Sequence, residues 1–173
     1  MNQQIANLKI LQSERDNPRY HYKVQAIDGF AADLAGCLAG SRLLEKEPTF
    51  VAVPPSLGRN HPEHDDRMMR ILHGLSDRLG GLDVRELIIQ NESMDPVHLE
   101  DGRRPPPAVL AENYSINDEI KQPAPVYIVV LDDVLTTGSH YKGVRMRLKE
   151  EFGNIPVIRI FLARRVFIEE EGP

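Results

Sequence analysis

Apolar and polar residues follow two different periods along the chain, which together predict an α/β protein. Apolar residues three and four positions apart predict helices over residues 24–44, 68–79 and 139–152. Short apolar runs between turn-forming residues predict strands over residues 49–53, 84–90, 126–131 and 155–163. Because helices and strands alternate, we expect a doubly wound, mostly parallel sheet in a single domain over residues 1–173.

Two segments do not follow this alternation. Residues 1–23 carry loosely alternating apolar residues on either side of a polar turn, which predicts two short strands. Residues 91–118 are polar, contain several prolines and show no clear period. A connection of that length without its own structure is typically a functional lid, so we expect a lid loop there.

The longest apolar run leads directly into two carboxylates and a turn. Residues 126–131, Val-Tyr-Ile-Val-Val-Leu, predict a strand buried on both faces. Asp132 and Asp133 follow at or just past its carboxyl end, where open α/β sheets bind ligands. Residues 136–140, Thr-Thr-Gly-Ser-His, predict a tight turn into a helix, whose N–H and hydroxyl groups suit a phosphate dianion. Paired carboxylates bind a diol or a divalent cation, so this stretch predicts a ribose 5-phosphate pocket.

This stretch resembles the signature of the type I phosphoribosyltransferases, which use phosphoribosyl pyrophosphate (PRPP). The ends of the strands over residues 49–53 and 155–163 are similar to the competence protein F-like branch of that family. The resemblance implies that Asp132 and Asp133 are the catalytic pair, bind the ribose hydroxyls, and meet Mg²⁺ indirectly through PRPP. It also implies that the turn wraps the 5-phosphate. The implied ribose and phosphate contacts are Asp132, Asp133, Val134, Leu135, Thr136, Thr137, Gly138, Ser139 and His140.

A second loop follows the strand over residues 49–53. Its prolines remove backbone donors and Gly58 permits unusual dihedral angles, so regular structure breaks there. The resembled family carries a pyrophosphate-binding loop at this place, and Arg67 and Arg70 are further cations close by. The alternatives are an exposed proline turn here and a plain surface loop over residues 91–118. The implied pyrophosphate contacts are Pro55, Ser56, Leu57, Gly58 and Arg59, with Arg103 and Arg104 from the lid.

The resemblance implies transfer of a phosphoribosyl group from PRPP to an unknown nitrogen acceptor, with release of pyrophosphate. It also implies a small hood with a contribution from about residues 1–23, which would carry acceptor specificity. Thr136 stands where several purine-salvage members have an aspartate, so no general base can be named. A non-catalytic PRPP- or nucleotide-binding module that regulates a partner protein is therefore the main alternative. A metal hydrolase using His61, His64 and Asp65 is another.

Composition narrows the class of protein further. The chain has 21 basic and 26 acidic residues and a net charge of −5, which argues against a nucleic-acid-coating surface. Cys37 is the single cysteine, so no internal disulfide forms and a cytoplasmic location is expected. We find no signal peptide and no apolar run long enough to span a membrane. Dimers are usual in the resembled family, so a homodimer and a partner protein both remain open.

Overall fold

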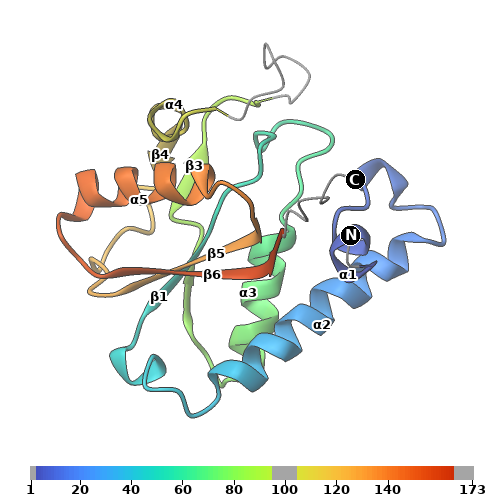
Figure 1. The fold of residues 1–173 in the computed structure, drawn as a ribbon, viewed down its shortest axis with the longest axis horizontal. Helices are drawn as coiled ribbons and strands as arrows, with labels where there is room; N and C mark the ends of the chain where they lie inside the picture. Colours follow the sequence, from blue (N-terminus) through green and yellow to red (C-terminus); the bar gives the residue numbers. More distant parts are fainter. Residues whose placement is uncertain (1–2, 95–104, 166–173) are drawn as a thin grey trace, which may run out of the picture.

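The structure is a computed structural model that describes residues 3–94 and 105–165. Its centre is a parallel sheet of four strands in the order β2–β1–β5–β6 (Figure 1). A separate antiparallel pair is formed by β3 and β4. The strands are β1 (Thr49–Ala52), β2 (Asp83–Arg85), β3 (Ile88–Gln90), β4 (Tyr114–Ile116), β5 (Ile128–Leu135) and β6 (Val157–Arg164).

Helices cover both faces of the parallel sheet (Figure 1). Side chains alternate along β1, so that Phe50 packs with the helices of one face while Val51 packs with those of the other. The α1, α2 and α3 helices lie on the first face; α4, α5 and the β3–β4 pair lie on the second. The helices are α1 (Gln3–Leu8), α2 (Tyr20–Leu38), α3 (Arg67–Arg78), α4 (Pro107–Glu112) and α5 (Ser139–Phe152), with 3-10 turns at Gln12–Glu14 and Leu44–Lys46.

The order of the strands creates a switch point between β1 and β5. The crossover from β1 through α3 leads outward to β2, and the crossover from β5 through α5 leads outward to β6 in the opposite direction. Such crossovers are right-handed, so α3 and α5 cover opposite faces, in agreement with the packing of buried Ile71 of α3 with Phe50 and of buried Val144 of α5 with Val51. A crevice therefore opens beyond the carboxyl ends of β1 and β5. This arrangement confirms the expected α/β class with a parallel sheet.

Two glycines shape the side of this crevice next to α5. Gly138, immediately before α5, has a φ of 69°, a conformation that glycine adopts without the steric cost of a Cβ atom. At Gly143 an added Cβ would lie 2.9 Å from the Cβ of Leu110. A larger residue would therefore push α4 away from α5, and α4 supplies part of the crevice wall.

The prediction for residues 1–23 is wrong. The segment forms α1, a 3-10 turn and the first residues of α2, and contains no strand among residues 3–23. Ile5 and Leu8 are both buried and are three residues apart, which is helical spacing. Tyr20 likewise starts the buried stripe of α2. The helical period was present, but the loose alternation of the segment obscured it.

Three other boundaries also differ. The strand expected over residues 84–90 divides into β2 and β3, which belong to different sheets. The segment expected to be a lid loop, residues 91–118, contains α4 and β4. Buried Leu110 and Tyr114 hold these two elements against the core, so the prediction of a loop is wrong for them. The remainder of that lid, residues 95–104, lies outside the described residues. β5 continues to Leu135, so Asp132 and Asp133 lie within the strand and not beyond it.

Among the helices that the structure describes, none is both long and apolar enough to cross a membrane.

Candidate functional site

A cavity of about 360 Å³ lies at the carboxyl ends of β1 and β5 and is called the β1–β5 cavity below. It brings together five of the predicted site residues: Pro55, Ser56, Asp132, Asp133 and His140. The other residues of its wall come from the N-terminal segment, the chain just after β1, the chain at the start of α3, and the segments after β3 and around α4. They are Lys9, Val53, Pro54, Asp65, Arg67, Met68, Met94, Pro105 and Leu110.

The two carboxylates of β5 face opposite sides of the sheet because side chains alternate along a strand. Asp133 faces α3. Its Oδ2 atom lies 3.0 Å from a terminal guanidinium nitrogen of Arg67 and 3.1 Å from Nζ of Lys9, and its Oδ1 accepts the Val134 N–H at 2.6 Å. Burial opposes ionisation of Asp133, but the two cations outweigh it and hold its pKa below the ordinary value.

Asp132 has no such partners and lies on the side of β4 and α5. Its Oδ1 accepts the Asp133 N–H at 2.8 Å, and it forms no ion pair with any described residue. Burial, followed by repulsion from Asp133, raises the pKa of Asp132 to about 6. Burial and the nearby Asp132 charge also raise the pKa of Tyr114, whose hydroxyl lies 2.9 Å from Nδ1 of His140. Asp132 is therefore an acceptor that a ligand can use.

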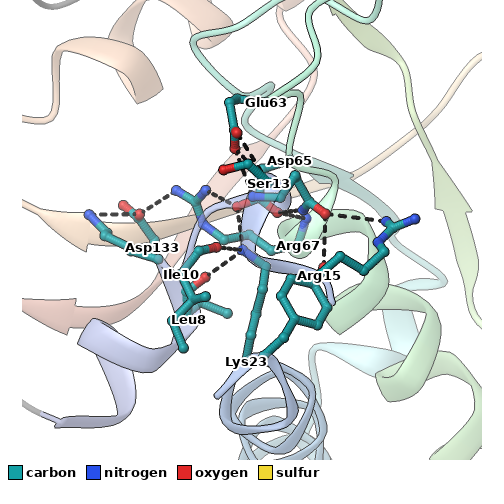
Figure 2. A network of polar contacts seen from close by, with 12 residues as sticks. Leu8, Ile10, Ser13, Arg15, Lys23, Glu63, Asp65, Arg67 and Asp133 are labelled. Carbon is teal, nitrogen blue, oxygen red and sulfur yellow. Dashed lines mark hydrogen bonds and ion pairs between the residues drawn. The ribbon is translucent and has the colours of Figure 1, made fainter. Parts of the chain in front are cut away.

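A charged network supports the Asp133 side of the cavity (Figure 2). The Lys23 side chain is fully buried in α2, and its Nζ donates to Oδ2 of Asp65 at 2.6 Å. Asp65 also accepts from Arg67 at 2.8 Å and from the side-chain amide of Gln12 at 2.9 Å. Burial opposes the Asp65 charge, but Arg67 and Lys23 hold its pKa below the ordinary value. The network therefore joins α2, α3 and β5 through alternating charges.

The turn formed by residues 136–139 is open to an anion. In the described structure, the N–H groups of Thr137, Gly138 and Ser139 donate to no protein atom. The hydroxyls of Thr137 and Ser139 lie 2.9 Å apart, and the hydroxyl of Thr136 is buried without a partner among the described residues. These groups do not belong to the described wall of the β1–β5 cavity, whereas His140 does. The turn thus adjoins the cavity at the start of α5.

Val134 and Leu135, also predicted to contact the ribose phosphate, are the last two residues of β5. Both are half-buried. The N–H of Val134 is occupied by Asp133, and the carbonyl of Leu135 accepts from the N–H of Arg165 at 3.0 Å. Their backbone therefore fixes the path of the strand into the turn.

The predicted pyrophosphate loop is only partly at the cavity. The structure does not bring Arg59 there, because its guanidinium pairs with Glu86 at 2.6 Å and lines a separate open hollow. The Gly58 N–H is also occupied, since it donates to the hydroxyl of Ser93 at 2.9 Å. Leu57 lines a neighbouring hollow of about 280 Å³ that shares Pro55 and Ser56 with the β1–β5 cavity.

Two further predicted cations, Arg103 and Arg104, lie outside the described residues. Of the nearby arginines, Arg70 lines the hollow of Arg59, whereas Arg67 lines the β1–β5 cavity. Arg67 is thus the arginine of α3 that the structure places at the carboxylates.

The histidine segment does not form the metal site that was considered. Nδ1 of His61 accepts the Glu63 N–H at 3.0 Å, and Nδ1 of His64 donates to the Leu57 carbonyl at 2.9 Å. Asp65 is committed to Lys23 and Arg67. No group of three or more metal-ligating side chains is arranged for a metal ion within residues 3–94 and 105–165. These contacts give no support to a metal hydrolase that uses His61, His64 and Asp65.

Mg²⁺ is compatible with this site in the indirect way that the resemblance implies. Asp133 has Oδ1 on the Val134 N–H and shares Oδ2 between Arg67 and Lys9, and these two cations oppose the close approach of a third. Asp132 has one oxygen engaged by a backbone N–H. A cation that arrives on a phosphorylated ligand and meets the acids through water is compatible with these contacts.

Sequence reasoning missed Lys9 and Lys23. No local sequence pattern marks Lys9 as a cavity residue, because a single lysine after a short helix is common on protein surfaces. For Lys23 there was a signal: it stands three residues after Tyr20 and four before Ile27, on the buried stripe of α2. A lysine on an apolar helical face requires a buried partner, and that partner is Asp65.

No model of a known protein family matches this sequence, and no curated protein matches it either. The function is therefore argued from the geometry of the cavity and the turn.

Proposed function

We propose that the chain is a phosphoribosyltransferase-like protein that binds PRPP or a related sugar phosphate at the carboxyl end of β5. The observation that carries the proposal is the continuity of β5 and its turn. One strand delivers Asp132 and Asp133 to a cavity at the switch point, and the next residues form a turn whose amides have no acceptor among the described residues. In ribose 5-phosphate one ring joins a diol to a phosphate, which matches the order of the acid pair and the turn along the chain.

The ribose hydroxyls are assigned to the acid pair. Asp132 is a carboxylate without an ion-pair partner among the described residues, so a hydroxyl that donates to it gives a charge-assisted hydrogen bond. Asp132 must be ionised to accept in this way, which requires a pH above its pKa of about 6. Asp133 is already ionised and held in place by Arg67.

The phosphate is assigned to the 136–139 turn. Three amides of the turn have no described protein acceptor, and α5 begins directly behind them with its positive dipole end. The buried, unpartnered hydroxyl of Thr136 is an additional donor of the same turn. A phosphate dianion would satisfy donors that the described part of the chain leaves unpaired.

In the proposed reaction a nitrogen nucleophile attacks C1 of the ribose. The C1–N bond forms as the C1–O bond breaks, and the electron pair of that bond leaves with pyrophosphate. Asp132 and Asp133 hold the ribose so that C1 faces the nucleophile. Mg²⁺ bound to the pyrophosphate would neutralise part of its developing charge.

A non-catalytic binding module is the second candidate, and one observation favours it. The structure turns Arg59 toward Glu86 and leaves Arg67 shared between Asp65 and Asp133. Neither arginine is therefore unpaired and aimed at a departing pyrophosphate, whereas binding of ribose and its phosphate needs neither. Such a module would report PRPP or nucleotide levels to a partner protein.

Calorimetric titration with PRPP, ribose 5-phosphate and nucleoside monophosphates, each with and without Mg²⁺, tests the proposal. We expect binding, and at least a tenfold loss of affinity in Asp132→Asn. Asp77→Asn is the matched control, because Asp77 is an exposed carboxylate near the far end of α3. Release of pyrophosphate during incubation with candidate nitrogen acceptors separates the transferase from the binding module. Absence of binding by every ligand would overturn both.

A further inference from the structure

The N-terminal segment brings one lysine to the β1–β5 cavity. Lys9 follows α1 directly and lines both this cavity and the neighbouring hollow beside Leu57. Its Nζ lies 3.1 Å from Oδ2 of Asp133, and its side chain is 44% exposed. The ammonium group therefore stands at the border between the acid pair and solvent.

The backbone around Lys9 is held by the buried Lys23. Nζ of Lys23 donates to the carbonyl of Leu8 at 3.0 Å and to that of Ile10 at 2.6 Å, the residues on either side of Lys9 (Figure 2). A buried ammonium group is costly unless it is paired, and here Asp65 supplies the counter-charge. The same contacts that satisfy Lys23 therefore fix the place from which the Lys9 side chain extends.

Asp133 does not depend on Lys9. The guanidinium of Arg67 lies 3.0 Å from the same oxygen, and its side chain is 21% exposed, about half as exposed as that of Lys9. A partly exposed lysine pair typically contributes little to stability. The Lys9 ammonium can therefore exchange Asp133 for another anion at small cost.

The charges of the described cavity wall show why such an exchange would help an anionic ligand to bind. The wall carries Asp65, Asp132 and Asp133 against two cations, Arg67 and Lys9. Arg67 is committed to two carboxylates, whereas Lys9 pairs with only one of them. Of the two, Lys9 is the cation more readily offered to an anionic ligand.

We propose that Lys9 is a ligand-binding cation supplied by the N-terminal segment, a role that rests on the proposed function. When a ligand with a second anionic group binds, the Lys9 ammonium leaves Asp133 and pairs with that group. Asp133 stays held by Arg67, and its oxygen becomes available to a ribose hydroxyl. Lys9 thus takes the part that the sequence had suggested for Arg59, and Lys23 is a positioning residue.

Titration of wild type, Lys9→Met, Lys9→Arg and Lys46→Met with three probes tests this role. The probes are PRPP with Mg²⁺, inorganic pyrophosphate with Mg²⁺, and ribose 5-phosphate. We expect Lys9→Met to weaken PRPP and pyrophosphate by tenfold or more, and ribose 5-phosphate by less than threefold. Lys9→Arg should restore most of the loss. Lys46→Met removes one exposed charge at the amino end of β1 and should change nothing.

The positioning role of Lys23 has its own measurement. Lys23→Met should weaken pyrophosphate binding when Lys9 is present, but add no further loss in the Lys9→Met background. A general loss of structure would weaken all three probes in both backgrounds and would overturn the positioning role. Far-ultraviolet circular dichroism checks that each variant keeps its helices.

The outcomes separate this inference from the proposed function. Loss of pyrophosphate binding in Lys9→Met, in a protein that binds neither PRPP nor ribose 5-phosphate, supports Lys9 as an anion-binding residue and overturns the proposed function. Equal affinities of wild type and Lys9→Met for PRPP overturn the role of Lys9 alone. Tighter binding by Lys9→Met overturns it as well, because Lys9 would then compete with the ligand. Absence of binding of all three probes overturns both.

Discussion

The two sides of β5 differ in how their carboxylates are satisfied. On the side of α3, Asp133 is paired with Arg67 and Lys9, and Asp65 is paired with Arg67 and Lys23. On the side of β4 and α5, Asp132 has no ion-pair partner among the described residues, and the 136–139 turn has amides and a hydroxyl without acceptors. Because a strand turns successive side chains to opposite faces, two adjacent aspartates share one cavity and have opposite environments.

This difference separates stability from binding. The paired side supplies attractive charge interactions in partly buried surroundings, so it stabilises the folded chain. The unpaired side keeps one carboxylate and several donors unsatisfied, which lowers stability unless a ligand supplies their partners. We therefore expect substitutions of the carboxylates on the first side to destabilise the protein, and substitutions on the second side to weaken binding with little loss of stability.

The largest effect is expected on the paired side, at Asp65. Asp65→Ala leaves Lys23 buried without its counter-charge, which should lower the free energy of unfolding by about 3–5 kcal/mol. Urea denaturation followed by circular dichroism measures the change. The double variant Lys23→Met/Asp65→Leu removes both charges together and should lose less than Asp65→Ala. A double variant less stable than the single one would contradict this account of the network.

The next largest effect is a difference in stability between substitutions of the two adjacent aspartates at pH 7.5. Asp133→Asn removes the charge that Arg67 and Lys9 contact and should destabilise the protein by roughly 1–2 kcal/mol. Asp132→Asn removes a buried, repelled charge and should stabilise the protein by a similar amount, about 1–2 kcal/mol, although it should weaken ligand binding at least tenfold. Thermal and urea unfolding of both variants give the signs. Equal destabilisation by the two substitutions would show that the two sides do not differ.

The network that governs these effects could not be predicted from the sequence. Arg67 and Asp133 are 66 residues apart, and Lys23 and Asp65 are 42 residues apart. Charged residues that far apart become neighbours only through the packing of α2, α3 and β5, which no local pattern records. The placement of Arg59 away from the cavity could not be predicted for the same reason, because its partner Glu86 lies 27 residues away, just after β2.

The features that local chemistry determines were predicted. The core strand, the turn and α5 follow one another without interruption, so the apolar run, the acids and Gly138 indicated them directly. α5 has the predicted bounds, and α3 starts one residue early. By contrast, α4 and β4 are three to six residues long and owe their form to contacts of buried Leu110 and Tyr114. Their sequences alone show no helical or strand periodicity from which the two elements could be predicted.

The pH dependence of stability sharpens the comparison between the acids. The pKa of Asp132 rises on folding from 3.8 to about 6, so the folded state binds its proton more tightly and this group lowers stability as pH increases from about 4 to 6. The lowered pKa values of Asp65 and Asp133 act in the opposite sense: their contribution is present above 3.8 and is lost as pH falls below it. The stability gained by Asp132→Asn should therefore grow between pH 4 and pH 7. Urea unfolding at half-unit intervals measures it, and a gain independent of pH would assign the effect to packing.

The smallest effect on stability is expected for Thr136→Val. This substitution should distinguish the unpaired side of β5 from the paired side most clearly, because it should change binding and leave stability almost unchanged. The buried hydroxyl of Thr136 has no partner in the described structure, so Thr136→Val keeps the shape and removes an unsatisfied group. The free energy of unfolding should stay the same or rise by less than about 1 kcal/mol. Affinity for ribose 5-phosphate should nevertheless fall severalfold, because a donor of the turn is lost. Ser115→Ala serves as the control, since that hydroxyl donates to Asn91 at 2.7 Å on the exposed side of β4. A clear loss of stability in Thr136→Val would mean that the hydroxyl already has a protein partner, and the turn would then belong with the paired side of β5.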